Sequence, residues 1–167
     1  MKYLETPISE ETIANLHVGD VVSISGWIYT GRDAVLPKIV ECIANQTLAN
    51  NIELQGSVIF HTAVSPAGVG PTSSNKKEIE DSFGSLSVAG VKLHLGKGAI
   101  TKETIEQLNQ NNSVFAILPP TTALFENQTF EREVVGWPEL GMEAFHRIRV
   151  ENYQAIIAAA HGKSIYK

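Results

Sequence analysis

The stretch "GDVVSISGWIYTGRDA", Gly19 to Ala34, joins a strand pattern to an arginine. It opens with a turn pair, and the residues that follow alternate in part between apolar and polar, as they do in a half-buried strand. The next stretch, "RDAVLPKIVECIANQ", has the apolar spacing of a helix, with Pro37 tolerated near its first turn. The sequence therefore predicts a strand, then a helix, with Arg32 at the junction.

The rest of the chain repeats this alternation of strands and helices. Strands are expected in "SVIFHTAV", "VKLHLGKG" and "SVFAILPP", and helices in "ISEETIANL", "NKKEIEDSF" and "TKETIEQLNQ", with Ser9 and Thr101 as helix caps. The segment "SPAGVGPTSS" is expected to be a loop, and "HRIRVENYQAIIAAAHGKSIYK" to form strands joined by a turn at Gly162. This order predicts one α/β domain over residues 1–167, with a mixed, mostly parallel sheet.

The composition excludes several classes of protein. The formal net charge is -5, which argues against nucleic acid or an anionic membrane as the main partner. The one cysteine, Cys42, forms no internal disulfide and cannot hold a metal centre alone, so no metal ligands are predicted in this chain. The first residues lack a signal-peptide core, and no apolar run is long enough to span a membrane. We expect a cytoplasmic protein.

Polar chemistry follows three of the predicted strands, in "TGRDA", "GVGPTSS" and "LGKGAI". Ligand groups in α/β sheets gather at the carboxyl ends of strands, and helix N-termini attract anions. The three segments offer side chains and backbone N–H groups that bind anions: Arg32, Thr72, Ser73, Lys97, Gly70 and Gly96. Together they predict a pocket for a small dianion, a carboxylate or a phosphate.

Each segment also has an ordinary structural interpretation. Arg32 and Asp33 can form a surface ion pair, and "GPTSS" and "GKG" are common turns. His61 and His94 lie in predicted strands and are expected to be core or edge residues rather than ligands. The anion pocket therefore depends on the three segments occurring together.

Four segments in this order resemble a known family: "GDVVSISGWIYTGRDA", "GPTSS", "LHLGKGAI" and "WPELGMEAFHRIRVENYQAII". The chain resembles the β subunit, or C-terminal domain, of class I fumarase and L(+)-tartrate dehydratase, which are iron–sulfur hydro-lyases. The resemblance implies a swivelling β/β/α fold and reversible hydration of a small dicarboxylate. It also implies a hetero-oligomer with a separate α subunit that holds a 4Fe-4S cluster through three cysteines, and an isolated β subunit could form a homodimer.

The resemblance assigns roles to residues of this chain. Arg32 would bind a substrate carboxylate, Thr72 would act as a catalytic base, and Lys97 would help to bind substrate. The substrate site implied in this way comprises Arg32, Asp33, Gly70, Thr72, Ser73, Lys76, Gly96 and Lys97.

The chain also departs from the pattern of that family. Leu36 stands where the family has a histidine, Lys76 replaces an arginine, and Pro119-Pro120 replaces glycines. An alternative is therefore a paralogue with altered catalysis that acts as a carboxylate-binding or regulatory partner. A third reading, a swivelling phosphohistidine domain with His161 as the carrier, has weaker support in the sequence.

Overall fold

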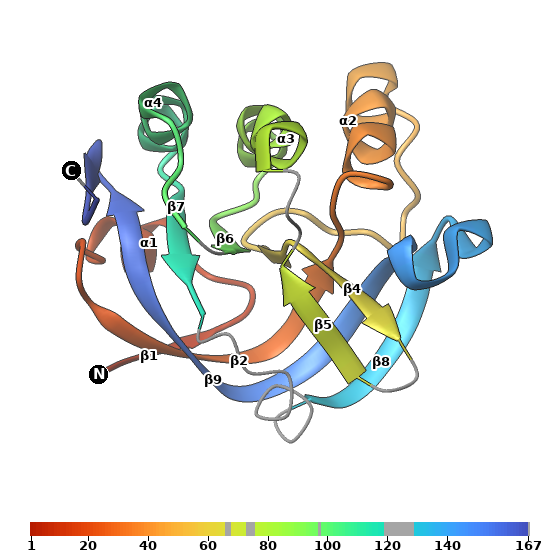
Figure 1. Ribbon diagram of the computed structural model, residues 1–167, viewed down its shortest axis with the longest axis horizontal. Helices are drawn as coiled ribbons and strands as arrows, with labels where there is room; N and C mark the ends of the chain where they lie inside the picture. The colour runs from red at the N-terminus through yellow and green to blue at the C-terminus, as the bar shows by residue number, and fades with distance from the viewer. Residues whose placement is uncertain (66–67, 73–75, 97, 119–128, 167) are drawn as a thin grey trace.

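The computed structural model describes residues 1–65, 68–72, 76–96, 98–118 and 129–166, and for residues 63–65, 68–72 and 76–79 it describes the backbone alone. Five of its strands form a closed ring, which we call the barrel (Figure 1). The strands of the barrel are β2 (Val21–Thr30), β3 (Val58–Phe60), β6 (Leu93–Gly96), β7 (Val114–Ile117) and β9 (Phe145–Ala160).

The long strand β9 closes the barrel. Parallel pairing joins β2 to β3, β3 to β6 and β6 to β7. Strand β9 then pairs antiparallel with β7 near its C-terminal end and antiparallel with β2 along most of its length. Closure leaves neither β2 nor β7 as a free edge of the ring.

The remaining strands extend the barrel or stand apart from it. β1 (Lys2–Glu5) pairs parallel with β2, while β8 (Thr129–Gly136) and β10 (Lys163–Ser164) pair antiparallel with β9. β4 (Thr62–Ser65) and β5 (Gly68–Thr72) form a separate antiparallel hairpin.

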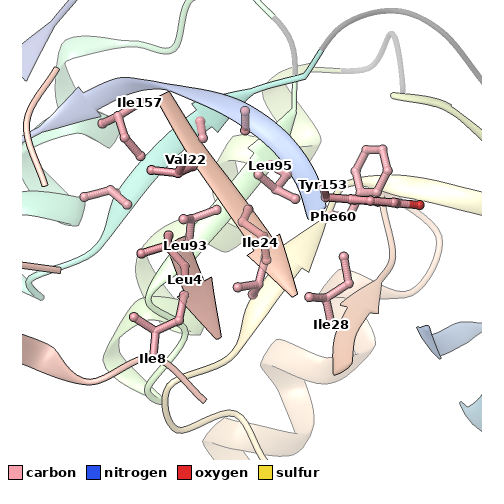
Figure 2. Close-up of a cluster of buried hydrophobic side chains, with 14 of the residues drawn as sticks. Leu4, Ile8, Val22, Ile24, Ile28, Phe60, Leu93, Leu95, Tyr153 and Ile157 are labelled. Carbon is pink, nitrogen blue, oxygen red and sulfur yellow. The ribbon is translucent and has the colours of Figure 1, made fainter. Parts of the chain in front are cut away.

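The interior of the barrel is apolar. Side chains alternate along each strand, so one set points inward and the other outward. Figure 2 shows the inward set, which includes Val22, Ile24, Ile28, Phe60, Leu93, Leu95 and Ile157, each at most 1% exposed. Burying this apolar surface is the main stabilising contribution to the fold.

Three helices cover the outward side chains (Figure 1): α2 (Leu36–Asn45), α3 (Lys76–Val88) and α4 (Lys102–Gln110). Ile59 packs outward with residues of α2 and α3, and Phe115 packs outward with Phe83 of α3 and Leu108 of α4. No helix in the described part of the chain is both long and apolar enough to cross a membrane.

The short helix α1 (Glu10–Ala14) lies at the amino end of the parallel strands. Lys92, just before β6, donates to the Glu10 carboxylate at 3.0 Å, and Asn112, just before β7, donates to the Glu10 carbonyl at 3.1 Å. Ile13 of this helix is fully buried in the core of the barrel. The helix therefore covers the amino end and leaves the opposite end for chemistry.

Several predictions are confirmed. The protein is α/β with a mixed sheet, Ser9 caps α1, Thr101 caps α4, and residues 161–162 turn between β9 and β10. Parallel pairing does not dominate the sheet, however, because β9 pairs antiparallel with β2, β7, β8 and β10.

The loop predicted for "SPAGVGPTSS" is wrong in part, because Gly68–Thr72 forms strand β5. The glycines and the proline of this segment are typical of a turn, but the pairing with β4 holds it extended. The strands β1 and β8 were not predicted, and α3 is longer than the helix expected there.

Candidate functional site

The carboxyl ends of four strands lie in a row along one end of the barrel. The backbone N–H of Gly31 donates to the Phe60 carbonyl at 3.1 Å, and that of His61 donates to the Leu95 carbonyl at 3.0 Å. The N–H of Leu118 donates to the Gly96 carbonyl at 3.3 Å. We call this end, marked by residues 31, 61, 96 and 118, the carboxyl edge, and both barrels and open sheets of α/β proteins bind ligands at this end of their parallel strands.

Arg32 stands at the carboxyl edge, in the turn between β2 and α2. The carbonyl of Arg32 accepts hydrogen bonds from the N–H groups of Val35 at 3.1 Å and Leu36 at 2.9 Å, which start the helix. Gly31 makes this turn possible, because a Cβ there would lie 2.8 Å from the Cγ1 of Val35. The sequence prediction of a strand-to-helix junction at Arg32 is confirmed.

The guanidinium of Arg32 is paired with the Glu143 carboxylate. Nε donates to Oε1 at 2.7 Å and to Oε2 at 2.9 Å, and Nη2 also donates to Oε1. Both side chains are 26% exposed, so water screens the pair only in part. The hydrogen bond to Glu143 raises the pKa of Arg32 above its usual value, and the arginine is charged at any physiological pH.

Glu143 reaches Arg32 through the packing of the segment that precedes β9. It ends a 3-10 helix, η1 (Pro138–Glu143). Two residues later, the Phe145 ring stacks on the Tyr29 ring with centroids 4.9 Å apart, and His146 pairs in register with Thr30. The sequence analysis missed this residue, which lies 111 positions from Arg32, although Glu143 falls within the quoted segment "WPELGMEAFHRIRVENYQAII".

The predicted second segment lies beside the same edge through its backbone. Thr72, at the end of β5, pairs with Thr62, which directly follows His61. Gly70 lies in the same strand, and Lys76 is the first residue of α3. The structure thus brings the backbone at Thr72 to the edge that carries Arg32.

The predicted third segment, "LGKGAI", also reaches the carboxyl edge, through Gly96. Gly96 is the last residue of β6 and its carbonyl belongs to the carboxyl edge. Asp33 follows Arg32 in the turn and is partly exposed. Ser73, Lys97 and Pro119-Pro120 lie outside the described residues.

The buried histidines form a hydrogen-bonded chain behind the edge. His94 Nδ1 lies 3.2 Å from His61 Nε2, and His94 Nε2 lies 3.0 Å from the Ser87 hydroxyl. Burial lowers the pKa of His94 to about 3, so its ring is neutral at pH 7. The interpretation of His61 and His94 as core residues is confirmed, since both are at most 1% exposed.

A third histidine, His146, lies opposite Thr30 at the end of β2. His146 is 8% exposed, and its Nδ1 lies 2.9 Å from the Ala144 carbonyl. Burial lowers its pKa, which favours the neutral ring. The sequence analysis gave His146 no role and missed its place next to Thr30 at the carboxyl edge.

The donor set of this chain does not fit an iron–sulfur cluster. A 4Fe-4S cluster is held by thiolates, and the sequence has the single cysteine Cys42. Among the residues that the structure describes, no three His, Cys, Asp or Glu side chains gather in a way that could hold a metal ion. The groups that the structure shows at the carboxyl edge are the Arg32–Glu143 pair and the backbone N–H and carbonyl groups of the strand ends.

Comparison with known proteins bears on the whole chain. The family model described as "Fumarase C-terminus" matches residues 2–167. The chain belongs to the fumarase C-terminus family. This membership confirms the resemblance that the four segments indicated.

Individual relatives of this fumarase C-terminus chain differ in length. A protein of Methanocaldococcus jannaschii named as an L(+)-tartrate dehydratase subunit beta is 30% identical, over 100% of this chain and 92% of the relative. The L(+)-tartrate dehydratase subunit beta of Escherichia coli is 32% identical, over 98% of this chain and 86% of the relative. A class I fumarate hydratase of Geobacillus stearothermophilus is 29% identical, but this chain spans only 33% of its length.

Proposed function

We propose that this chain is the β subunit of a hydro-lyase that reversibly hydrates a small dicarboxylate, fumarate to L-malate or oxaloacetate to tartrate. The observation that carries the proposal is the match over nearly the whole length of two relatives named as tartrate dehydratase β subunits. The names of those relatives also support a hetero-oligomer with an α subunit.

The position of Arg32 supports its assignment as a carboxylate-binding residue. A guanidinium matches the two oxygens of a carboxylate with two parallel N–H groups, and Arg32 stands at the end of the barrel where α/β proteins bind ligands. Lys97 would hold the second carboxylate, and Asp33, Ser73 and Lys76 would line the site. The backbone N–H groups of Gly70 and Gly96 would complete it.

Thr72 is proposed to move the carbon-bound proton. In the dehydration direction the proton leaves the carbon next to one carboxylate, and the hydroxyl group leaves as water from the neighbouring carbon. The electron pair of the broken C–H bond forms the double bond, and the negative charge that builds up on the carboxylate would be stabilised by Arg32 and Lys97. A neutral threonine is a weak base, so Thr72 needs a carboxylate from the partner subunit to accept its own proton.

The iron–sulfur chemistry belongs to the partner in this proposal. The α subunit would hold the 4Fe-4S cluster, whose open iron supplies a Lewis acid for the leaving hydroxyl group. This chain would contribute binding, orientation and proton transfer. A single cysteine suits the reducing cytoplasm, where we expect the complex to work.

A second function, carboxylate binding without turnover, is favoured by Leu36. The histidine that the family has at this position is replaced by a fully buried leucine, which is the first residue of α2. A buried leucine can neither transfer a proton nor contact a polar ligand. The substitution therefore removes a polar group four residues from Arg32, and this loss favours a binding function.

Anaerobic co-expression with an α subunit of the same organism tests the proposal. The purified, cluster-loaded complex is assayed for hydration of fumarate and for dehydration of L-malate and of the tartrate isomers. Turnover of any one of them supports the hydro-lyase and names the acid. A stable, cluster-loaded complex without turnover on all of them favours the binding function instead.

A further inference from the structure

The Arg32–Glu143 pair uses only one side of the guanidinium. Glu143 accepts from Nε and from Nη2, whose N–H groups form one edge of the planar guanidinium. An arginine has five N–H groups in a planar fork, so two remain on Nη1 and one on Nη2. No other side chain in the described part of the chain accepts a hydrogen bond from these three.

The free N–H groups have the geometry that a carboxylate needs. Nη1 and Nη2 lie at the end of the guanidinium, and a carboxylate can accept parallel hydrogen bonds from both. Glu143 can stay bound to Nε and Nη2 at the same time. Arg32 can therefore hold Glu143 and a ligand at once. Since a free arginine side chain samples many rotamers, fixing it beforehand removes part of the ordering cost of binding.

Glu143 itself is fixed by the fold. It is the last residue of η1, and the buried residues Ala144 and Phe145 follow it directly. Phe145 stacks on Tyr29, three residues before Arg32 on the neighbouring strand. The carboxylate is thus anchored by the start of β9, and Arg32 is anchored by the end of β2.

We propose that Glu143 is a positioning residue for Arg32. Its carboxylate binds Nε and Nη2 of the guanidinium, so that Nη1 and the second N–H group of Nη2 point to a substrate carboxylate. The inference rests on the proposed function, because it needs Arg32 to bind the dicarboxylate. Glu143 makes no contact with substrate in this proposal and acts through Arg32 alone.

Hydrogen exchange of the Arg32 Nε proton tests the pair in the full chain, without a partner subunit. With 15N-labelled arginine, Glu143→Gln is expected to raise this exchange rate roughly tenfold, since the amide replaces a charge-assisted acceptor with a neutral one. Glu131→Gln is the matched control, because Glu131 pairs with Arg149 Nε at 3.0 Å on β8 and β9. That control should leave the Arg32 signal unchanged. An unchanged rate in Glu143→Gln overturns the inference.

A double-mutant cycle in the reconstituted complex tests whether Glu143 acts through Arg32. Glu143→Gln should raise KM about tenfold and change kcat less than about threefold, and Glu143→Asp should recover part of the loss. In an Arg32→Ala background Glu143→Gln should have no further effect. A loss that persists in that background overturns the inference and leaves the proposed function standing. If Arg32→Ala itself changes nothing, the proposed role of Arg32 fails, and the positioning role of Glu143 fails with it.

Discussion

The interior of the barrel and its carboxyl edge are built by the same strands, yet they hold opposite kinds of residue. Inside, Leu93, Leu95 and Phe60 are fully buried and apolar. At the edge, Arg32 lies two residues after the end of β2 and Glu143 two residues before the start of β9. They form an ion pair in which each side chain is 26% exposed. The comparison teaches that the alternation within the strands decides the fold, while residues just past the strand ends are free to carry chemistry.

The two regions should also differ in what a substitution changes. A partly exposed ion pair contributes only about 0–1 kcal/mol to stability, whereas a buried leucine contributes several times more. Changes in the interior should therefore lower the free energy of unfolding. Changes at the edge should lower activity in a chain that folds normally.

The largest expected effect is on the interior. Leu93→Ala should lower the free energy of unfolding by about 2–5 kcal/mol, because it removes buried surface and leaves a cavity. Urea denaturation of the isolated chain measures it. Val21→Ala, on β2 but 40% exposed, serves as the control and should cost less than about 1 kcal/mol. Equal losses in the two variants would mean that the barrel is not the stabilising core.

The next effect is at the edge. Thr72→Val should lower kcat of the reconstituted complex about a hundredfold, because the hydroxyl that moves the proton is lost, with KM within about threefold of the original. Thr72→Ser should restore part of the activity, since it keeps the hydroxyl. Steady-state kinetics, with whichever acid the co-expressed complex turns over, measures both variants. A rise in KM with unchanged kcat would mean that Thr72 binds substrate and does not transfer the proton.

The free energy of unfolding should depend on pH because of the buried His94. The pKa of His94 is lowered to about 3 in the folded chain, against about 6.5 in the unfolded one, so only the unfolded chain gains a proton as the pH falls below about 6.5. Its contribution to stability is complete above that pH and decreases as the pH falls towards 3. The loss should be about 2 kcal/mol at pH 5 relative to pH 8.

Urea denaturation at several pH values measures this effect. His94→Gln should flatten the dependence between pH 6.5 and 5 by about 1.1 kcal/mol per pH unit, since the titrating group is gone. Parallel curves for the two proteins would contradict a neutral, buried His94.

The smallest expected effect concerns two helix caps at different ends of the barrel. The Thr101 hydroxyl accepts from the Thr104 N–H at 3.2 Å, and the Ser9 hydroxyl accepts from the Thr12 N–H at 3.1 Å. Thr101→Ala and Ser9→Ala should each cost about 1 kcal/mol in unfolding free energy. Thermal denaturation measures both, and a loss in only one of them would show that the caps depend on their surroundings.

The sequence predicted the parts of the fold whose pattern is local. Apolar runs placed β2, β3, β6 and β7, and Ser9 and Thr101 marked two helix starts. Strand β8 was missed because most residues on both of its faces are exposed. It therefore lacks the alternation of apolar and polar residues that predicts a strand. Strand β5 was missed because its extended shape comes from pairing with β4 and opposes its own glycines and proline.

The site, like the fold, could be predicted only where its signal is local. Arg32 could be placed because it directly follows a recognisable strand. Glu143 could not, because its contact with Arg32 depends on the closure of β9 against β2, a pairing between distant parts of the chain. Closure of the barrel is a feature that local patterns do not contain.

The measurement that tests the central claim most directly compares activity and stability in Arg32→Ala. In the reconstituted complex, kcat/KM for the dicarboxylate should fall at least about a hundredfold, which is roughly 2.7 kcal/mol of transition-state stabilisation. The free energy of unfolding of the isolated chain should change by less than about 1 kcal/mol. Arg149→Ala, which removes a pair on β8 and β9, should leave kcat/KM unchanged. Near-normal turnover in Arg32→Ala would contradict the account, because the carboxyl edge would then not be where the substrate binds.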